Sequence, residues 1–199
     1  LCGVMREGML GGVNLSLTRR IRICYLRDEI EVTDTVCNEG YRSVPHMLLY
    51  HCNLGYPLVQ PDSVLRIPNR GVRARTPFAE ARLPELDVIL PPQDELEEMC
   101  YYYQLQPEPD GWTRVRLENR REGLGMTLSF DTAALPQFLQ WKNFVKGEYV
   151  MGLEPANCTI DGRGDALARG QLRTLAPGQS AVYRLRFRFD DGQEGEIRP

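Results

Sequence analysis

The sequence predicts an all-β protein arranged as a β-sandwich, and three features of the chain lead to this prediction. Apolar and polar residues alternate with a period of two in several separate segments. Turn-forming residues separate these segments at intervals of about 8 to 12 residues, which is typical of sandwiches. Helical patterns are confined to two short segments, near 131–135 and 164–169. The chain of 199 residues fits one core, so we expect a single domain over 1–199.

The first part of the chain predicts three strands. Residues 20–26 and 29–36 both alternate between polar and apolar side chains, and Arg27-Asp28 between them forms a tight hairpin turn. A second turn is expected at 38–40. The mostly apolar segment 46–52 then predicts a further strand, which ends at an Asn-Leu-Gly turn.

The middle and the end of the chain differ in regularity. Residues 59–94 are rich in proline and arginine and predict a long, irregular loop with short strands at most, a kind of segment that is often functional. The later alternating segments predict five strands, at 98–105, 112–118, 125–131, 136–141 and 149–153. The clearest alternation is at 181–190, where arginines occupy one face and aromatic residues and leucine the other.

Composition excludes several classes of protein. The net charge is -3 and the charges are scattered, so we expect no binding of nucleic acid. No apolar run reaches the roughly 20 residues that span a bilayer, and no signal peptide is visible, so we expect a cytoplasmic protein without a membrane partner. The cysteines show neither C-x-x-C spacing nor a cluster with histidine, which predicts reduced, mostly buried thiols and no metal site. They are Cys2, Cys24, Cys37, Cys52, Cys100 and Cys158.

The chain has two histidines, and both lie in the segment 45–57. His51 stands at the end of a predicted strand beside Asn53, and imidazole suits proton transfer near neutral pH. The alternative is a histidine of the core that bonds a backbone carbonyl. His46 precedes His51 by an odd number of residues, so a regular strand would point them to opposite faces. We therefore interpret His46 as structural.

A second segment supplies a carboxylate. Glu154 follows an apolar strand and precedes Pro155. A glutamate that ends a buried strand is desolvated, which raises its pKa and makes it a better base. The alternative is an exposed carboxylate at the end of a strand.

Further candidates precede and surround these two residues. Gln140 could bond a sugar hydroxyl, Trp141 could stack on a sugar ring, and Lys142 could pair with Glu154 or contact a ligand oxygen. The alternatives are core packing for the indole and a solvated lysine. Glu98, at the start of an earlier strand, is a weaker candidate for the same site.

Two stretches of the sequence resemble a known family. His51-Cys52-Asn53-Leu54-Gly55 resembles the H-x-Y-F-N-L segment of galactose mutarotase (aldose 1-epimerase), and Leu139-Gln140-Trp141 with Gly152-Leu153-Glu154-Pro155 resembles its Q-x-Y and L-E-x-Q segments. The longer stretches 45–58 and 152–157 are similar to a bacterial branch of aldose 1-epimerase-like proteins. Asn53 and Asn157, which lie in these stretches, are further candidate substrate-binding residues.

The resemblance implies a galactose mutarotase-like β-supersandwich that acts on a small-molecule sugar without metal or cofactor. It assigns the general acid to His51, which would protonate the ring oxygen, and the general base to Glu154, which would take the proton of the anomeric hydroxyl. Gln140 corresponds to a position near the sugar, and Glu98 falls where the family has a sugar-binding aspartate. A homodimer is compatible with such a fold.

The sequence also departs from the family. Mutarotases use an arginine and another histidine from an earlier part of the chain, and no histidine precedes residue 46 here. We therefore expect 1–199 to be the C-terminal portion of a longer family domain. Two other functions stay open. One is a sugar-binding domain without catalysis, and the other is an isomerase of open-chain sugars.

Overall fold

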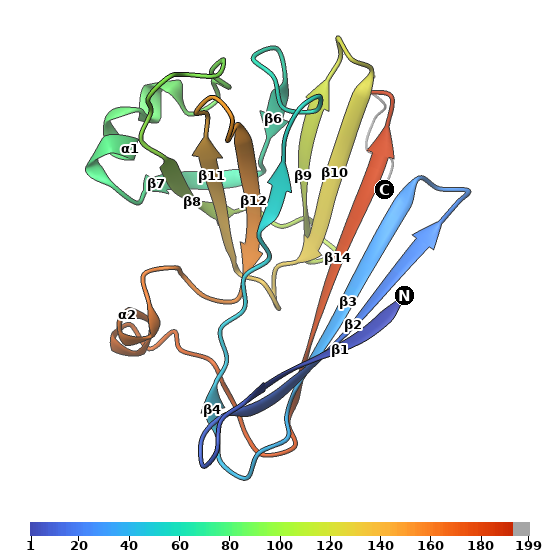
Figure 1. The fold of residues 1–199 in the computed structure, drawn as a ribbon, viewed down its shortest axis with the longest axis vertical. Helices are drawn as coiled ribbons and strands as arrows, with labels where there is room; N and C mark the ends of the chain where they lie inside the picture. Colours follow the sequence, from blue (N-terminus) through green and yellow to red (C-terminus); the bar gives the residue numbers. More distant parts are fainter. Residues whose placement is uncertain (193–199) are drawn as a thin grey trace.

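The protein is almost entirely β-structure, as the sequence predicts. The structure is a computed structural model that describes residues 1–192. Figure 1 shows two antiparallel sheets, of which the larger extends well beyond the smaller. The seven-stranded sheet contains, in spatial order, β1 (Cys2–Gly8), β2 (Asn14–Cys24), β3 (Glu29–Asn38), β14 (Ser180–Asp190), β10 (Leu124–Asp131), β9 (Trp112–Asn119) and β6 (Val64–Arg66).

The smaller sheet carries the site described below. Its five strands are, in spatial order, β5 (Cys52–Leu54), β12 (Val150–Ala156), β11 (Gln137–Asn143), β8 (Met99–Leu105) and β7 (Asn69–Ala74). A two-stranded pair joins β13 (Thr174–Leu175) to β4 (Val44–Pro45).

The core lies between the two sheets. Phe130 of β10 and Phe138 of β11 are fully buried and stack with their ring centroids 5.6 Å apart. Strand β14 follows the predicted alternation, because Tyr183 and Leu185 are buried whereas Arg184 is exposed. The period-two pattern therefore predicts correctly which face of this strand meets the core.

The prediction of a strand over 46–52 is wrong. Only β4 before this segment, an isolated bridge at Leu49, and β5 at its end pair as strands. The segment carries the chain from the larger sheet to the smaller one (Figure 1). Its backbone groups bond distant partners, with His46 N donating to Arg173 O and Tyr50 N to Pro155 O, both at 2.9 Å. The apolar composition reflects burial during this crossing and not membership of one strand.

The proline- and arginine-rich stretch is more regular than predicted. Residues 59–94 contain β6, β7, the helix α1 (Pro77–Ala81) and the 3-10 helix η1 (Leu83–Glu85). Helix α1 begins with Thr76 as its N-cap, whose side chain accepts from Ala79 N, and Pro77 occupies the first turn.

Two smaller predictions also need correction. The expected helix at 131–135 is a turn, whereas the one near 164–169 is present as α2 (Arg163–Ala168). The cysteines with described side chains are free thiols, as expected, but only Cys100 is buried. Among residues 1–192, no helix is long and apolar enough to cross a membrane.

Candidate active site

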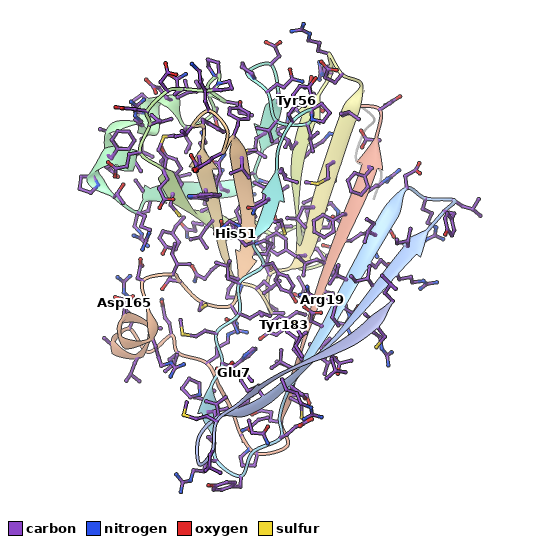
Figure 2. The ribbon with its side chains drawn as sticks, in the orientation of Figure 1. Glu7, Arg19, His51, Tyr56, Asp165 and Tyr183 are labelled. Atoms are coloured by element: carbon purple, nitrogen blue, oxygen red, sulfur yellow. The ribbon has the colours of Figure 1, made fainter. Side chains whose placement is uncertain are left out.

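The outer face of the smaller sheet brings His51 and Glu154 together. Glu154 lies on β12, and the register that pairs Leu153 with Cys52 places His51 next to it. His51 Nε2 is 3.0 Å from Glu154 Oε1. The imidazole is 46% exposed and the carboxylate only 3%, so solvent reaches the pair from the histidine side. Figure 2 labels His51 at the start of β5, beside β12.

The pair holds at least one proton. His51 Nδ1 lies 2.7 Å from Asn53 Oδ1, and a carbonyl oxygen can only accept, so Nδ1 carries a hydrogen. Nε2 and Oε1 would then face each other as two lone pairs unless one of them is protonated. Burial raises the pKa of Glu154, the nearby His51 opposes this shift, and the charge of Glu98 adds to it. Oε1 is buried and has no other hydrogen-bond partner within residues 1–192, so the imidazole is the group that it meets.

Trp141 and Glu98 form one side of the site. The indole Nε1 donates to Glu98 Oε2 at 2.8 Å. The same ring meets His51 edge to face, with centroids 5.2 Å apart and an interplanar angle of 72°. Glu98 thereby fixes the orientation of an aromatic surface beside the acid–base pair.

These residues line a cleft of about 250 Å³. The volume lies below the roughly 300–1,000 Å³ of sites for drug-sized ligands, so the cleft suits one small polar molecule. Its walls are Leu49, His51, Arg75, Glu98, Cys100, Trp141, Glu154 and Ile160. Arg75 is not among the predicted site residues, because it lies in the stretch that was expected to be irregular.

Gly152 is a second residue that the sequence analysis missed. A Cβ at this position would lie 2.6 Å from Glu154 Oε1 and 3.3 Å from His51 Cε1. Only glycine therefore leaves the carboxylate in its place beside the imidazole. Its position two residues before Glu154, on the same face of a strand, is a signal that the sequence does carry.

Gln140 and Lys142 lie on the opposite face of the sheet from Glu154. Alternation along β11 points Trp141 outward and its two neighbours into the sandwich. Gln140 Oε1 accepts from Tyr103 Oη at 2.7 Å. Lys142 Nζ donates to the carbonyls of Leu86 and Val88, so the expected pair with Glu154 is not formed. Burial lowers the pKa of Lys142 to about 8.

Asn157 lies outside the cleft and supports the crossing segment instead. Its Oδ1 accepts from Leu48 N at 2.7 Å, and its Nδ2 donates to His46 O and Tyr183 Oη. His46 Nε2 lies 2.8 Å from the same tyrosine hydroxyl, and its side chain is buried. The structural interpretation of His46 is confirmed. Of the predicted site residues, the structure thus brings together His51, Glu154, Trp141, Glu98 and Asn53.

Several solved structures share this fold. A Klebsiella pneumoniae protein described as a candidate aldose 1-epimerase matches with a TM-score of 0.90 at 21% identity, over 96% of this chain and 50% of that one. An Escherichia coli K12 protein with the same description matches with a TM-score of 0.65 at 18% identity, over 95% of this chain and 64% of that one. A galactose mutarotase related enzyme from Lactobacillus acidophilus matches with a TM-score of 0.66 at 14% identity, over 96% and 68%.

These similarities show that the fold is a galactose mutarotase-like β-sandwich, as the sequence predicts. The chain spans half of the Klebsiella protein's length. No curated protein matches the sequence significantly. The sequence profile described as a domain of unknown function, DUF4432, matches residues 1–189, and the chain therefore belongs to the DUF4432 family.

Proposed function

We propose that this chain carries the acid–base pair of an aldose 1-epimerase-like enzyme, which interconverts the α and β anomers of a sugar. The observation that carries the proposal is the 3.0 Å approach of His51 Nε2 to the buried Glu154 Oε1 at the wall of a small cleft. The mutarotase-like fold supports it.

The reaction requires an acid and a base side by side. Ring opening adds a proton to the ring oxygen and removes one from the anomeric hydroxyl, and both oxygens are bonded to C1. Two groups that approach each other within hydrogen-bond distance can reach two such neighbouring oxygens. A sugar that enters the cleft would replace their mutual contact with one contact to each oxygen.

The proton count closes over one cycle. His51, as the imidazolium, donates to the ring oxygen while the Glu154 carboxylate takes the hydroxyl proton, and the bond from C1 to the ring oxygen breaks. The aldehyde then rotates about the C1–C2 bond. On closure Glu154 returns its proton to the carbonyl oxygen and His51 takes the proton of the attacking hydroxyl. Each group ends in its starting state, without a metal or a cofactor.

The other cleft residues have positioning roles in this proposal. Asn53 holds the histidine ring through Nδ1, and Gly152 leaves room for the carboxylate. Trp141 offers an aromatic face to the sugar ring, and Glu98 can accept a hydroxyl hydrogen as well as the indole N–H.

The test is the rate of anomer exchange by saturation-transfer NMR on galactose, glucose, fucose and deoxyribose. General acid–base catalysis contributes about 10²–10⁴-fold, so His51→Ala and Glu154→Gln should each reduce the exchange to near the spontaneous rate. Glu95→Gln, which removes an exposed carboxylate of the 91–98 loop, should retain full activity. Full activity in both site variants would refute the proposal. Sugar binding without rate enhancement in the wild type would identify a binding domain instead.

A further inference from the structure

We propose that the cleft takes sugars that carry an oxyanion, such as the carboxylate of a uronic acid or a phosphate ester, and that Arg75 binds this group. The inference rests on the sugar-directed function proposed above and specifies its substrate class. It is carried by where Arg75 lies relative to the acid–base pair and by what its guanidinium contacts.

Arg75 stands at the end of the cleft opposite Glu154. Its backbone N–H donates to Cys100 O at 2.9 Å, which extends the pairing of β7 with β8 by one residue. From β12 to β7 the sheet order is β12-β11-β8-β7, so three strand spacings separate the two ends. At about 4.8 Å each, the backbones lie roughly 14 Å apart. Arg75 and Glu154 therefore line the same cleft from strands on its two sides.

The floor of the cleft between Arg75 and Glu154 is apolar, and the charges of both residues act on it. It contains Cys100, which lines the cleft and is buried. Burial is the main cause that raises the pKa of the Cys100 thiol to about 12. Glu154 raises this pKa further and Arg75 lowers it, so both charged groups act at the same floor.

The Arg75 guanidinium has unused donors. Its closest ionic partner is Asp161, with Nε and Oδ1 3.6 Å apart, which is beyond a hydrogen bond. Asp161 is held instead by the Tyr102 hydroxyl at 3.0 Å, and it also lies 3.8 Å from Arg73 Nη2. Within residues 1–192 the Arg75 side chain donates no hydrogen bond, and it is 38% exposed. A planar fork of five donors therefore borders the cleft.

An oxyanion fits this fork better than a hydroxyl. Guanidinium binds carboxylate or phosphate with two parallel N–H···O bonds, and such bonds are about twice as strong as neutral ones. Glu98, the other charged residue at the cleft wall beside the pair, accepts from the Trp141 indole. It lies one strand from Arg75, two residues before Cys100, and its carboxylate suits a hydroxyl group of the sugar.

The test compares charged with neutral sugars on the same protein. Anomer exchange is measured for glucuronate, galacturonate and glucose 6-phosphate beside glucose and galactose, with the full chain as wild type, Arg75→Gln, Arg75→Lys and Arg73→Gln. Hydrogen bonds to charged groups contribute about 10–100-fold in affinity, so the wild-type kcat/KM should favour at least one charged sugar by about that factor. Arg75→Gln should bring this preference close to 1, and Arg75→Lys should restore part of it.

Arg73→Gln is the matched control. Arg73 shares Asp161 with Arg75 but stacks on Tyr102, with 4.2 Å from its guanidinium carbon to the ring centroid, and does not line the cleft. It should keep the wild-type preference. Comparing the two uronates with glucose 6-phosphate identifies which oxyanion the site prefers. A wild-type preference for neutral sugars, or a preference unchanged by Arg75→Gln, overturns the inference.

Failure of the proposed function is distinguishable from failure of this inference. If no sugar shows accelerated exchange, the enzymatic proposal fails, and equilibrium binding of glucuronate against glucose, followed by ligand-observed NMR, decides the inference. Tighter binding of glucuronate that is lost in Arg75→Gln supports an oxyanion site. Equal binding of the two sugars by the wild type overturns it.

Discussion

At the scale of single residues, the proton affinity of Glu154 decides the pH range of the proposed reaction. The base must be ionised, and burial raises its pKa above the ordinary 4.5 of a glutamate. Activity should therefore fall on the acid side at a higher pH than an exposed glutamate would allow.

Glu98→Gln tests this electrostatic coupling. The negative charge of Glu98 contributes to the raised pKa of Glu154, so its removal lowers that pKa and moves the acid limb of kcat/KM to lower pH. The amide oxygen can still accept from Trp141, which preserves the packing of the indole. A pH profile of exchange measured beside Glu95→Gln provides the check. An acid limb that stays in place, or that moves to higher pH, would contradict the role of Glu98.

Rules that apply to single residues also show how much of the site could be predicted from the sequence. Consecutive residues of a strand point to opposite faces, so Gln140, Trp141 and Lys142 could not all reach one ligand. Applied to these residues, this rule selects Trp141, which shares the outer face with Glu154. The distant partners of Asn157 could not be predicted in this way. Leu48 is 109 positions away, and no local pattern encodes that contact.

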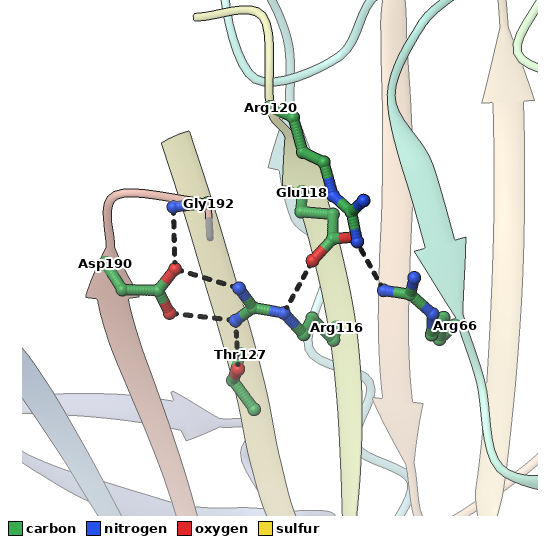
Figure 3. A network of polar contacts seen from close by, with 7 residues as sticks. All are labelled: Arg66, Arg116, Glu118, Arg120, Thr127, Asp190 and Gly192. Carbon is green, nitrogen blue, oxygen red and sulfur yellow. Dashed lines mark hydrogen bonds and ion pairs between the residues drawn. The ribbon is translucent and has the colours of Figure 1, made fainter. Parts of the chain in front are cut away.

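At the scale of elements, an ion-pair network ties the strands of the larger sheet together near one end. Figure 3 shows Arg116 of β9 reaching across β10 to Asp190 of β14. Its two Nη atoms donate to the carboxylate at 2.8 and 2.9 Å, and its Nε donates to the buried Glu118 at 3.0 Å. Arg66 of β6 also donates to Glu118, at 2.8 Å. Arg116 Nη1 also donates to Thr127 Oγ1 of β10 at 3.2 Å, so the network connects four strands.

Gly125 of β10 makes room for this crossing. A Cβ there would lie 2.1 Å from Asp190 Oδ1 and 2.8 Å from Arg116 Nη2. Because these atoms end flexible side chains, Gly125→Ala should displace the ion pair without refolding the sheet. We expect a loss of about 1.5–3 kcal/mol in the free energy of unfolding, measured by urea denaturation. Gly164→Ala, in α2 with no atom within 4 Å of its Cβ, should be neutral or slightly stabilising.

The pH dependence of this loss identifies its cause. Arg116 lowers the pKa of Asp190 below the ordinary 3.8. A lowered carboxyl pKa gives stability that is present above 3.8 and is lost as the pH falls through the folded-state value. The difference between wild type and Gly125→Ala should therefore shrink in acid. A difference that stays constant down to that range would point to strain in the backbone instead.

At the scale of the whole molecule, local sequence patterns predict the strands better than they predict the segments that connect them. Period-two alternation predicts strands such as β14, which buries one face against the core. Residues 46–50, which cross from the larger sheet to the smaller one, do not follow this rule, because the two sheets bury them in turn. Helix α1 was missed although Thr76-Pro77 is a recognisable helix start, because the surrounding prolines and arginines favoured an irregular interpretation.

The two ends of the larger sheet should differ in local stability. β1 pairs only with β2, and all seven of its residues are exposed. β10 lies between β9 and β14, and six of its eight residues are buried. Few buried contacts allow local opening, so β1 should open at a free energy at least about 3 kcal/mol below that of β10, which is roughly a hundredfold in exchange rate.

Hydrogen exchange followed by mass spectrometry measures this difference along the whole chain. β7, an edge strand of the smaller sheet against which α1 packs, provides the comparison and should exchange at an intermediate rate. Protection of β1 equal to that of β10 would contradict the prediction and mean that something covers the strand in solution. Protection that grows with protein concentration would then identify the cover as a second copy of the chain, because only self-association depends on concentration in this way.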